Sequence, residues 1–445
     1  MSSFDFTSLN DLERETDSKH HARWGADTCD KHGHRKEYYS HTLAAFDIET
    51  SLIDTGKDHP EAAMYIWMFA LEDRVTLFGR TWEQFQDCLT RINDNLPSKQ
   101  VLIVWVHNLA YEWQFMRWFF DWQKVFLVGK RKPITARWQN IEFRCSYKQT
   151  NMSLDAFTHK MGAKHSKLSG DDFDYKAKRY PWTELSFSQL NYCENDVVGL
   201  IEAMRIQMEK DDDSLYSIPL TSTGYVRRDV RKAVAYFQQY LKPLYPNEDL
   251  YRILKDAFRG GDVHANPAYS GKVLKNVKSV DKSSAYPSVQ CIEKFPVSSF
   301  KLRENATFEQ MEKLIFVHKK ALVFRIRFTK LFSKDPFPPE PYLSFAKVKV
   351  AGERVLDNGR VVCANTLETA LTDIDYKIVK DNYTWESAEI LELWDATYGI
   401  LPKGLIKVVQ EYYKAKTALK DVDGQEYFYM KSKNKLNAIY GMSAQ

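Results

Sequence analysis

The chain has 445 residues, which is enough for two or three domains of ordinary size. Its 63 lysines and arginines nearly balance its 59 aspartates and glutamates, and the formal net charge is +4. This balance excludes a uniformly basic nucleic-acid-binding protein, so any nucleic-acid site must be a local patch. None of the six cysteines forms a CxxC pair, which argues against a zinc ribbon or a disulfide framework and favours a reducing, intracellular setting.

Neither a membrane segment nor a folded N-terminus is predicted. The longest apolar stretch, 62–71, is about half of the ~20 residues that a membrane helix needs, and no signal peptide opens the sequence. We therefore expect a soluble, cytoplasmic protein with no membrane partner. Residues 1–40 are polar and lack periodicity, which predicts an arm or tail. Cys29, His32 and His34 lie in this arm, but a closed zinc site needs a fourth ligand, so a solvated tail is preferred.

From residue 41 the sequence alternates between strand and helix patterns. Apolar runs predict strands at HTLAAFDIETSL, MYIWMFALE, VTLF and QVLIVWVHNL, and helical patterns cover 82–93 and 111–122. Alternation of this kind is typical of an α/β domain, which we place at 41–210.

Four acidic residues of this domain form a candidate metal site. Asp47 and Glu49 lie two apart on the first predicted strand, so both carboxylates project from one face. Glu112 follows a buried strand, and Asp196 lies four residues after Tyr192 on an amphipathic helix. A DxE pair alone is a weak signal, because polar residues are common at strand ends. Four carboxylates together can hold two divalent cations about 3.5–4 Å apart, which suits phosphodiester hydrolysis.

Three segments that carry these residues, FDIET, HNLAYEWQF and YCEND, resemble the exonuclease motifs of the family B DNA polymerases. The resemblance implies a ribonuclease H-like 3′→5′ exonuclease with two Mg²⁺ (or Mn²⁺) ions per active site. Asp47, Glu49, Glu112 and Asp196 would be the catalytic metal ligands, and Tyr192 would orient the attacking water. Glu112 departs from the pattern, because protein-primed members usually carry aspartate there; its extra methylene alters reach.

The same resemblance implies contacts with single-stranded DNA. The implied residues are Thr50, Asn108, Leu109, Tyr111, Ser146, Tyr147 and Tyr175. For Ser146 and Tyr147, ordinary strand residues are an equally good interpretation. The family also uses a lysine before a DxDY-like run; DDFDY has no lysine at that spacing, and Lys167 is the nearest candidate.

Residues 211–262 are interpreted as a linker followed by helices. The segment FRGGDVHANP resembles the YxGG element that joins exonuclease to polymerase in the protein-primed group and touches template DNA, with Phe258 in place of tyrosine. Gly260 and Gly261 would make that contact. Because adjacent glycines allow unusual backbone angles, a tight turn without a DNA role stays an alternative.

The next segment, VKSVDKSSAYPSVQ, predicts a strand that ends at Asp281, followed by a turn at the proline. It resembles polymerase motif A, DxxSLYP, and places the start of a palm at 263–290. The resemblance implies that Asp281 is a catalytic metal ligand. The backbone amides of Ser284 and Ala285 would bind phosphates, and Tyr286 would lie under the sugar and exclude a 2′-hydroxyl.

The remaining sequence is expected to hold an insertion and a fingers region. Residues 291–400 predict strands and turns, positioned like the terminal-protein-binding insertion of protein-primed enzymes. Within 401–445, MKSKNKLNAIYG predicts an amphipathic helix with Lys433, Asn437 and Tyr440 on one face. This stripe resembles motif B, KxxxNSxYG, whose lysine and tyrosine serve the incoming nucleotide.

Motif C, a YxDTD hairpin that supplies the second catalytic carboxylate, does not occur in the 445 residues. Asp373 and Asp375 precede motif B and resemble a family segment outside the active site. The resemblance therefore indicates a protein-primed family B DNA polymerase, present as an N-terminal fragment or as one part of a split polymerase. Its fold would be an α/β ribonuclease H-like exonuclease domain followed by an incomplete α+β palm with fingers helices.

The partners implied are template-primer DNA, dNTPs, a terminal protein and a C-terminal polypeptide that carries motif C. Two other functions stay open. One is a stand-alone 3′→5′ exonuclease with a degenerate, DNA-gripping palm, and the other is a non-enzymatic DNA-binding subunit.

Overall fold

The computed structural model describes residues 37–442, except 55, 57–58, 73–74, 98, 167–176, 236–243, 262, 264 and 336–340. The chain forms two compact units: the first is Met1–Val226 with Lys416–Lys435, and the second is Arg227–Ala415 with Leu436–Gln445. The predictions for Cys29, His32, His34, Lys167 and Tyr175 lie outside the described residues.

The first unit is built on an eight-stranded sheet with the order β4-β3-β2-β5-β8-β7-β6 and with β1 beside β5. Its strands are β1 (Tyr38–Tyr39), β2 (Ala44–Ile53), β3 (Glu61–Leu71), β4 (Val75–Gly79), β5 (Gln100–Val106), β6 (Lys124–Leu127), β7 (Pro133–Trp138) and β8 (Ile141–Cys145). Its helices are α1 (Trp82–Asn95), α2 (Leu109–Met116), α3 (Ser146–Thr150), α4 (Leu154–Met161) and α5 (Phe187–Asp211). Three helices have residues in both units: α6 (Ser222–Ala233), α12 (Lys403–Ala418) and α13 (Glu426–Met442).

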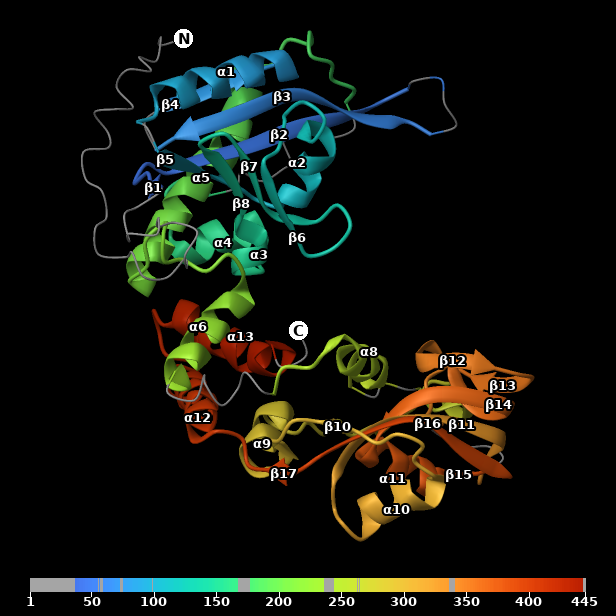
Figure 1. The fold of residues 1–445 in the computed structure, drawn as a ribbon. Coiled ribbons are helices and arrows are strands. Elements are labelled where there is room, and N and C mark those ends of the chain that lie inside the picture. Colours follow the sequence, from blue (N-terminus) through green and yellow to red (C-terminus); the bar gives the residue numbers. More distant parts are fainter. Residues whose placement is uncertain are drawn as a thin grey trace. The chain divides into compact units, whose positions relative to one another are not determined.

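Helices cover both faces of this sheet (Figure 1). Strands β2, β5 and β8 are parallel in the centre, and every residue of β5 is buried, as expected for a strand covered on two sides. One core joins α1 and α2 to the sheet, and a second core joins α4 and α5 to its other face. A capping box of Thr81 and Gln84 begins α1, and one of Ser186 and Gln189 begins α5. The α/β alternation predicted for this unit is present, and the strand order places β2 between β3 and β5, inside the sheet.

The helix predicted over 111–122 is shorter than expected, because α2 ends at Met116. Phe120 and Trp122 both pack into the core on this face of the sheet. Residues two apart project from different sides of a helix, so a continued helix could not bury both rings. The chain instead turns, and the Trp122 indole donates a hydrogen bond to the Arg117 carbonyl at 3.1 Å.

The second unit is built on an antiparallel sheet with the order β10-β16-β11-β14-β12, with β13 paired to β14 and β15 to β11. Its elements are α8 (Glu248–Ala257), the 3₁₀ turn η7 (Pro267–Tyr269), α9 (Ala285–Ile292), β9 (Phe295–Pro296), β10 (Lys301–Leu302), α10 (Phe308–Phe316), β11 (Ala321–Ser333), the 3₁₀ turn η8 (Phe345–Lys347), β12 (Val348–Ala351), β13 (Arg354–Asp357), β14 (Arg360–Thr372), α11 (Asp373–Asn382), β15 (Tyr383–Thr384), β16 (Ser387–Ala396) and β17 (Tyr398–Gly399). Strands β9 and β17 form a separate pair.

Helices lie on both sides of this sheet (Figure 1), and alternating residues of its strands pack on opposite sides. Val323 and Ala370 pack against α8, whereas their neighbours Phe324 and Leu371 pack against α10 and α11. The segment 291–400 was expected to contain strands and turns. It also contains these two helices, because an antiparallel sheet with apolar residues on both faces needs cover on each.

The strand predicted before Asp281 is wrong. Residues 277–283 form no strand, and α9 begins at Ala285, so Pro287 lies in the first turn of a helix and is buried. Val277 and Val280 are 70% and 93% exposed. A strand needs a hydrogen-bonded neighbour, and none of the described strands pairs with this segment.

Among the helices of the described ranges, none is both long and apolar enough to cross a bilayer.

The close approach of α5 to the segment after α4 predicts a strict requirement for glycine. A Cβ on Gly199 would lie 2.2 Å from the carbonyl oxygen of His165. This segment is held against α5, because His165 N donates a hydrogen bond to the Glu202 carboxylate at 3.0 Å. Gly199→Ala should lower the free energy of unfolding by ~1–3 kcal/mol, because the added methyl forces the backbone apart. Thermal and denaturant unfolding measure this change.

The sign of that effect is diagnostic, because alanine in an unobstructed helix is about 1 kcal/mol more favourable than glycine. Gly129→Ala is a control for loss of a glycine without a clash, since Gly129 lies in the loop between β6 and β7 and nothing lies within 4 Å of a Cβ at that position. A Gly199→Ala protein as stable as the Gly129→Ala control would contradict the packing described.

Candidate functional site

An acidic cluster forms at β2 and α5 of the first unit. The carboxylate oxygens of Asp47, Glu49 and Asp196 include a set whose members all lie within 4.8 Å of one another. Asp47 and Glu49 project from the same face of β2, and a register shift against β3 falls directly after Glu49. Helix α5 packs across β2 and β3, which brings Asp196 to this face. Three of the four predicted ligands thus meet at one place in the fold.

Glu112, the fourth predicted ligand, lies on α2 and is almost fully buried. It shares a hydrogen bond with Asp47. Burial raises the pKa of Glu112 to about 8, and the charge of Glu49 adds to the rise. A hydrogen bond between two carboxyl groups needs a proton, so the pair holds one proton near neutral pH. Among the described residues, none donates a hydrogen bond to the buried Glu112 Oε2.

Two further side chains lie against this cluster. Tyr192, one helical turn before Asp196 on α5, is buried beside it. Burial raises the pKa of the neighbouring Cys193 thiol, and the charges of Glu49 and Asp47 raise it further.

The acidic cluster fits divalent cations. Carboxylate oxygens are the ligands that Mg²⁺ and Mn²⁺ prefer, and carboxylates from one strand and two helices approach from different directions. An unsatisfied buried oxygen on Glu112 is costly unless a proton or cation meets it. Asp47, Glu49, Glu112 and Asp196 could therefore hold such ions, and a bound ion would replace the proton.

The residues predicted to contact single-stranded DNA divide into two groups. Thr50 and Tyr111 meet at the surface, where their hydroxyl oxygens lie 2.5 Å apart, and the Tyr111 ring is 42% exposed. Burial raises the pKa of Tyr111, and the charges of Glu112, Glu49 and Asp47 raise it further, so this pair borders the acidic cluster.

In the second group, Asn108 is exposed and Tyr147 is half-buried, whereas Leu109 and Ser146 are buried. Leu109 is fully buried in the core with α1, and Ser146 is buried with its hydroxyl 3.0 Å from His107 Nδ1. Neither side chain is available to a DNA strand in this structure, because both are used to fix α2 and α3 to the sheet. Asn108 begins α2 with left-handed backbone angles (φ 70°), and the ring of Tyr147 packs edge-on against His107.

Sequence analysis missed Tyr65 and Arg179 near the acidic cluster. Burial raises the pKa of Tyr65, and the charge of Glu49 raises it further. The Arg179 guanidinium lies over the Tyr65 ring at 6.0 Å, and its backbone amide donates to the Ser51 hydroxyl at 3.0 Å. No spacing rule points to either residue. The only hint is that Arg179 closely follows the acidic DDFDY run.

In the second unit, the segments that resemble motifs A and B meet through two tyrosines. Tyr286 on α9 and Tyr440 on α13 stack with ring centroids 4.2 Å apart and planes 16° apart. Ser284 precedes α9 with φ 51°, and Ala285 is its first residue, so the backbone amides of both residues lie at a helix start, where backbone amides can bind anions. Asp281 is exposed on the segment that leads to α9.

Helix α13 presents the predicted stripe to solvent. Lys433 and Asn437 are exposed and Tyr440 is half-buried, whereas Leu436 and Ile439 on the other side of the helix are buried. The i, i+4, i+7 spacing therefore gives one polar face as expected.

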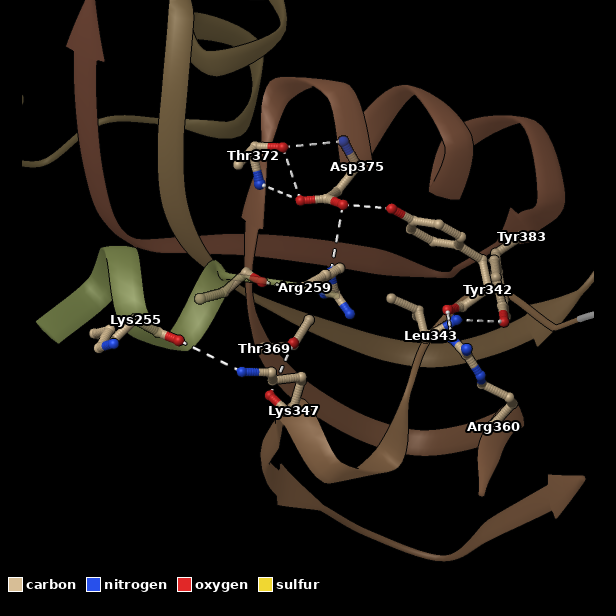
Figure 2. A network of polar contacts seen from close by, with 11 residues as sticks. Lys255, Arg259, Tyr342, Leu343, Lys347, Arg360, Thr369, Thr372, Asp375 and Tyr383 are labelled. Atoms are coloured by element: carbon tan, nitrogen blue, oxygen red, sulfur yellow. Dashed lines mark hydrogen bonds and ion pairs between the residues drawn. The ribbon is translucent and has the colours of Figure 1, made fainter. Parts of the chain in front are cut away.

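Asp373 and Asp375 are both committed to structural contacts. Asp373 Oδ1 accepts hydrogen bonds from Leu322 N at 3.1 Å and from the Tyr398 hydroxyl at 2.8 Å. Asp375 caps the start of α11 and faces Arg259 (Figure 2). Both carboxylates are buried, and these partners leave them no role as open metal ligands.

Residues 130–445 match the sequence family described as DNA polymerase type B, organellar and viral. The chain belongs to this family. The DNA polymerase of Bacillus phage B103 is 20% identical over 337 residues, which cover 71% of this chain and 54% of that protein. The chain therefore spans about half the length of this polymerase relative.

Solved structures of Phi29 DNA polymerase share the polymerase fold. The complex with primer-template DNA matches with a TM-score of 0.65 at 14% identity, covering 91% of this chain and 68% of that one. The ternary complex with primer-template DNA and incoming nucleotides matches with a TM-score of 0.62, covering 90% and 68%. This likeness confirms the predicted fold class, an exonuclease-like α/β unit followed by a palm region.

Proposed function

We propose that this chain supplies the 3′→5′ proofreading exonuclease and the first part of the polymerase site of a protein-primed DNA polymerase. The acidic cluster carries the first half of the proposal, because four carboxylates beside a buried tyrosine suit hydrolysis of a phosphodiester with two cations. The Tyr286–Tyr440 stack supports the second half, because it brings together two segments that are far apart in the sequence.

In the proposed nuclease reaction, bound Mg²⁺ or Mn²⁺ would lower the pKa of the attacking water and stabilise the leaving oxygen. The Tyr192 hydroxyl would orient that water for attack on the terminal phosphodiester. Thr50 and Tyr111 would hold the last nucleotide, because a partly exposed ring offers a stacking face and a hydroxyl pair offers donors to a phosphate. Arg179, close to the cluster, would add positive charge.

In the proposed polymerase site, Asp281 would bind a metal ion with the triphosphate. The amides at the start of α9 and Lys433 would bind its phosphates, Asn437 and Tyr440 would border the nascent base pair, and Tyr286 would lie under the sugar. Gly260 and Gly261 would approach the template. Primer-template DNA, dNTPs and a priming terminal protein at the 291–400 insertion are the proposed partners.

A second catalytic carboxylate would come from a YxDTD segment, either on a continuation of this polypeptide or on a separate chain. The exposed valines at 277 and 280 support this part of the proposal, because a strand from such a segment would cover them. The segment 277–283 and that strand would then form the palm sheet, with Asp281 at its edge.

Removal of Asp47 tests the nuclease assignment. Asp47→Ala should abolish Mg²⁺-dependent degradation of single-stranded DNA from its 3′ end, by a factor of ~10³ or more, since this carboxylate is expected to ligate both ions. Gel analysis of end-labelled DNA measures the loss. Asp155→Ala, a change in the first turn of α4, is a surface control that should keep full activity. Undiminished degradation by Asp47→Ala would refute the assignment.

Glu112 should make metal binding depend on pH. The proton held by Glu112 and Asp47 must leave when a cation binds, so the apparent Mg²⁺ affinity should rise up to ~10-fold per pH unit below the Glu112 pKa of about 8 and level off above it. Nuclease rates at subsaturating Mg²⁺ between pH 6.5 and 9 measure this.

Two variants separate charge from reach at this position. Glu112→Asp should retain much of the activity and the pH slope, whereas Glu112→Gln should lose both, because an amide neither releases a proton nor binds Mg²⁺ well. A glutamine variant as active as the unchanged chain would show that this carboxylate has no catalytic role.

The 445-residue chain alone should bind primed DNA and degrade it but not extend it. Phosphoryl transfer to a 3′-hydroxyl needs carboxylates on both sides of the metal pair, and Asp281 supplies one side. Adding a polypeptide that carries YxDTD and the following thumb should restore extension, and Asp281→Ala should abolish it again.

Two results would contradict this prediction or favour another function. Template-directed incorporation by the 445-residue chain alone would refute the need for motif C. Degradation without extension in every mixture would favour the stand-alone exonuclease.

A further inference from the structure

A buried ion pair joins the start of the FRGG turn to the insertion in the second unit. Arg259 Nε lies 3.3 Å from Asp375 Oδ1, and the two side chains are only 16% and 10% exposed. Figure 2 shows Arg259, which follows α8, facing Asp375 in the first turn of α11. The pair thus connects two segments that are more than 100 residues apart in the sequence.

Asp375 is held rigidly on its own side of the pair. Its Oδ2 accepts hydrogen bonds from Thr372 N at 2.9 Å and from the Thr372 hydroxyl at 2.7 Å, and its Oδ1 accepts one from the Tyr342 hydroxyl. With its oxygens fixed from three directions, the carboxylate presents one defined position to Arg259 (Figure 2).

Arg259 is held by two further contacts. Its Nη2 donates to the Ala370 carbonyl at 3.3 Å, and its guanidinium lies 5.7 Å from the centre of the Tyr342 ring. A planar guanidinium that meets a carboxylate, a carbonyl and a ring has little rotational freedom, which a lysine could not reproduce. The backbone at residue 259 is therefore a fixed point.

This fixed point lies two residues before a close approach to Tyr286. A Cβ on Gly261 would lie 2.9 Å from the Tyr286 hydroxyl oxygen. Gly260 lies between Arg259 and Gly261. No heavy atom of the described residues lies within 4 Å of where its Cβ would be, so packing around Gly260 does not hold it in place. The Tyr286 ring is stacked on Tyr440, and its hydroxyl occupies the space beside Gly261 that a Cβ would need.

We propose that the Arg259–Asp375 pair is a positioning device that holds the Gly260–Gly261 backbone against the Tyr286 hydroxyl. It thereby sets how strongly the nucleotide site rejects a 2′-hydroxyl. The proposal rests on the proposed function, in which Tyr286 lies under the sugar. Sugar selection depends on where the tyrosine hydroxyl stands relative to C2′, so a shift of the backbone that limits this hydroxyl changes selectivity more than overall affinity.

Binding of dATP and ATP to the 445-residue chain on primed template DNA tests the proposal. Calorimetric titrations in Mg²⁺ give the two dissociation constants, and their ratio is the readout; each chain used in the titrations also carries Asp47→Ala, so that the primer is not degraded. Asp375→Asn and Arg259→Lys should each lower the preference for dATP by ~3- to 10-fold while changing the dATP dissociation constant less. Nuclease activity, which belongs to the first unit, should stay unchanged in both variants.

Two comparisons isolate the effect. Arg327→Met removes an ion pair with Glu368 on the same sheet, at 3.1 Å, and should leave the dATP to ATP ratio unchanged. Gly261→Ala keeps the ion pair but displaces the Tyr286 hydroxyl, and should also lower the ratio. If Asp375→Asn unfolds the second unit, Arg259→Lys and Gly261→Ala still decide the question.

Different results would overturn the positioning role and the proposed function. Unchanged ratios in folded Arg259→Lys and Asp375→Asn proteins, together with a lowered ratio in Tyr286→Ala, would overturn the positioning role and leave the proposed function standing. An unchanged chain that binds dATP and ATP equally well would overturn both.

Discussion

Repulsion among acidic side chains is the constraint around which the first unit is arranged. Carboxylate oxygens 4.8 Å apart repel by about 3 kcal/mol per charged pair at an effective dielectric of 20, and burial strengthens this repulsion. The fold nevertheless brings Asp47, Glu49 and Asp196 together and adds Glu112 beneath them. Because β2 is central, cores on both sides of the sheet hold these residues in place. A shared proton relieves the repulsion in the free protein, and cations would relieve it during the proposed reaction.

The acidic cluster lies between buried and exposed parts of the first unit. Glu112 and Asp196 are buried by α2 and α5, whereas Thr50 and Tyr111 meet at the surface beside them. In the proposed nuclease reaction, the DNA would therefore approach the carboxylates from the side of Thr50 and Tyr111.

The second unit depends on contacts of another kind. Its charged residues pair with each other, as Asp373 does with Lys377 within the segment 291–400 and as Asp375 does with Arg259, which lies outside that segment. The segment around Asp281 lacks such contacts within the described ranges and leaves Val277 and Val280 exposed. The sheet of the second unit is therefore covered by its own helices, whereas Val277 and Val280 beside Asp281 are exposed. The Tyr286–Tyr440 stack is the contact through which α9 and α13 already meet.

Local patterns predicted the elements well and their partners less well. The strand period gave the shared face of Asp47 and Glu49, and the helix period gave the polar stripe of α13 and the exposed position of Lys433. Sequence could not show that Leu109 faces the core, because a helix start beside a functional motif serves packing as well as binding. It also could not reveal the strand pairing that 277–283 lacks, since pairing depends on distant residues. The Arg259–Asp375 pair could not be predicted from the sequence either, because its two residues are distant from each other in the chain.

Binding of Mn²⁺ to the 445-residue chain tests the central claim most directly, because it examines the acidic cluster without DNA or turnover. At pH 8.5, calorimetry with electron paramagnetic resonance should detect two Mn²⁺ ions that are magnetically coupled, as expected for ions about 3.5–4 Å apart. Asp196→Asn should abolish the coupling, and Asp281→Ala should leave it intact. Absence of a coupled pair in the unchanged chain, or a coupled pair that survives Asp196→Asn, would contradict a two-metal nuclease site at these carboxylates.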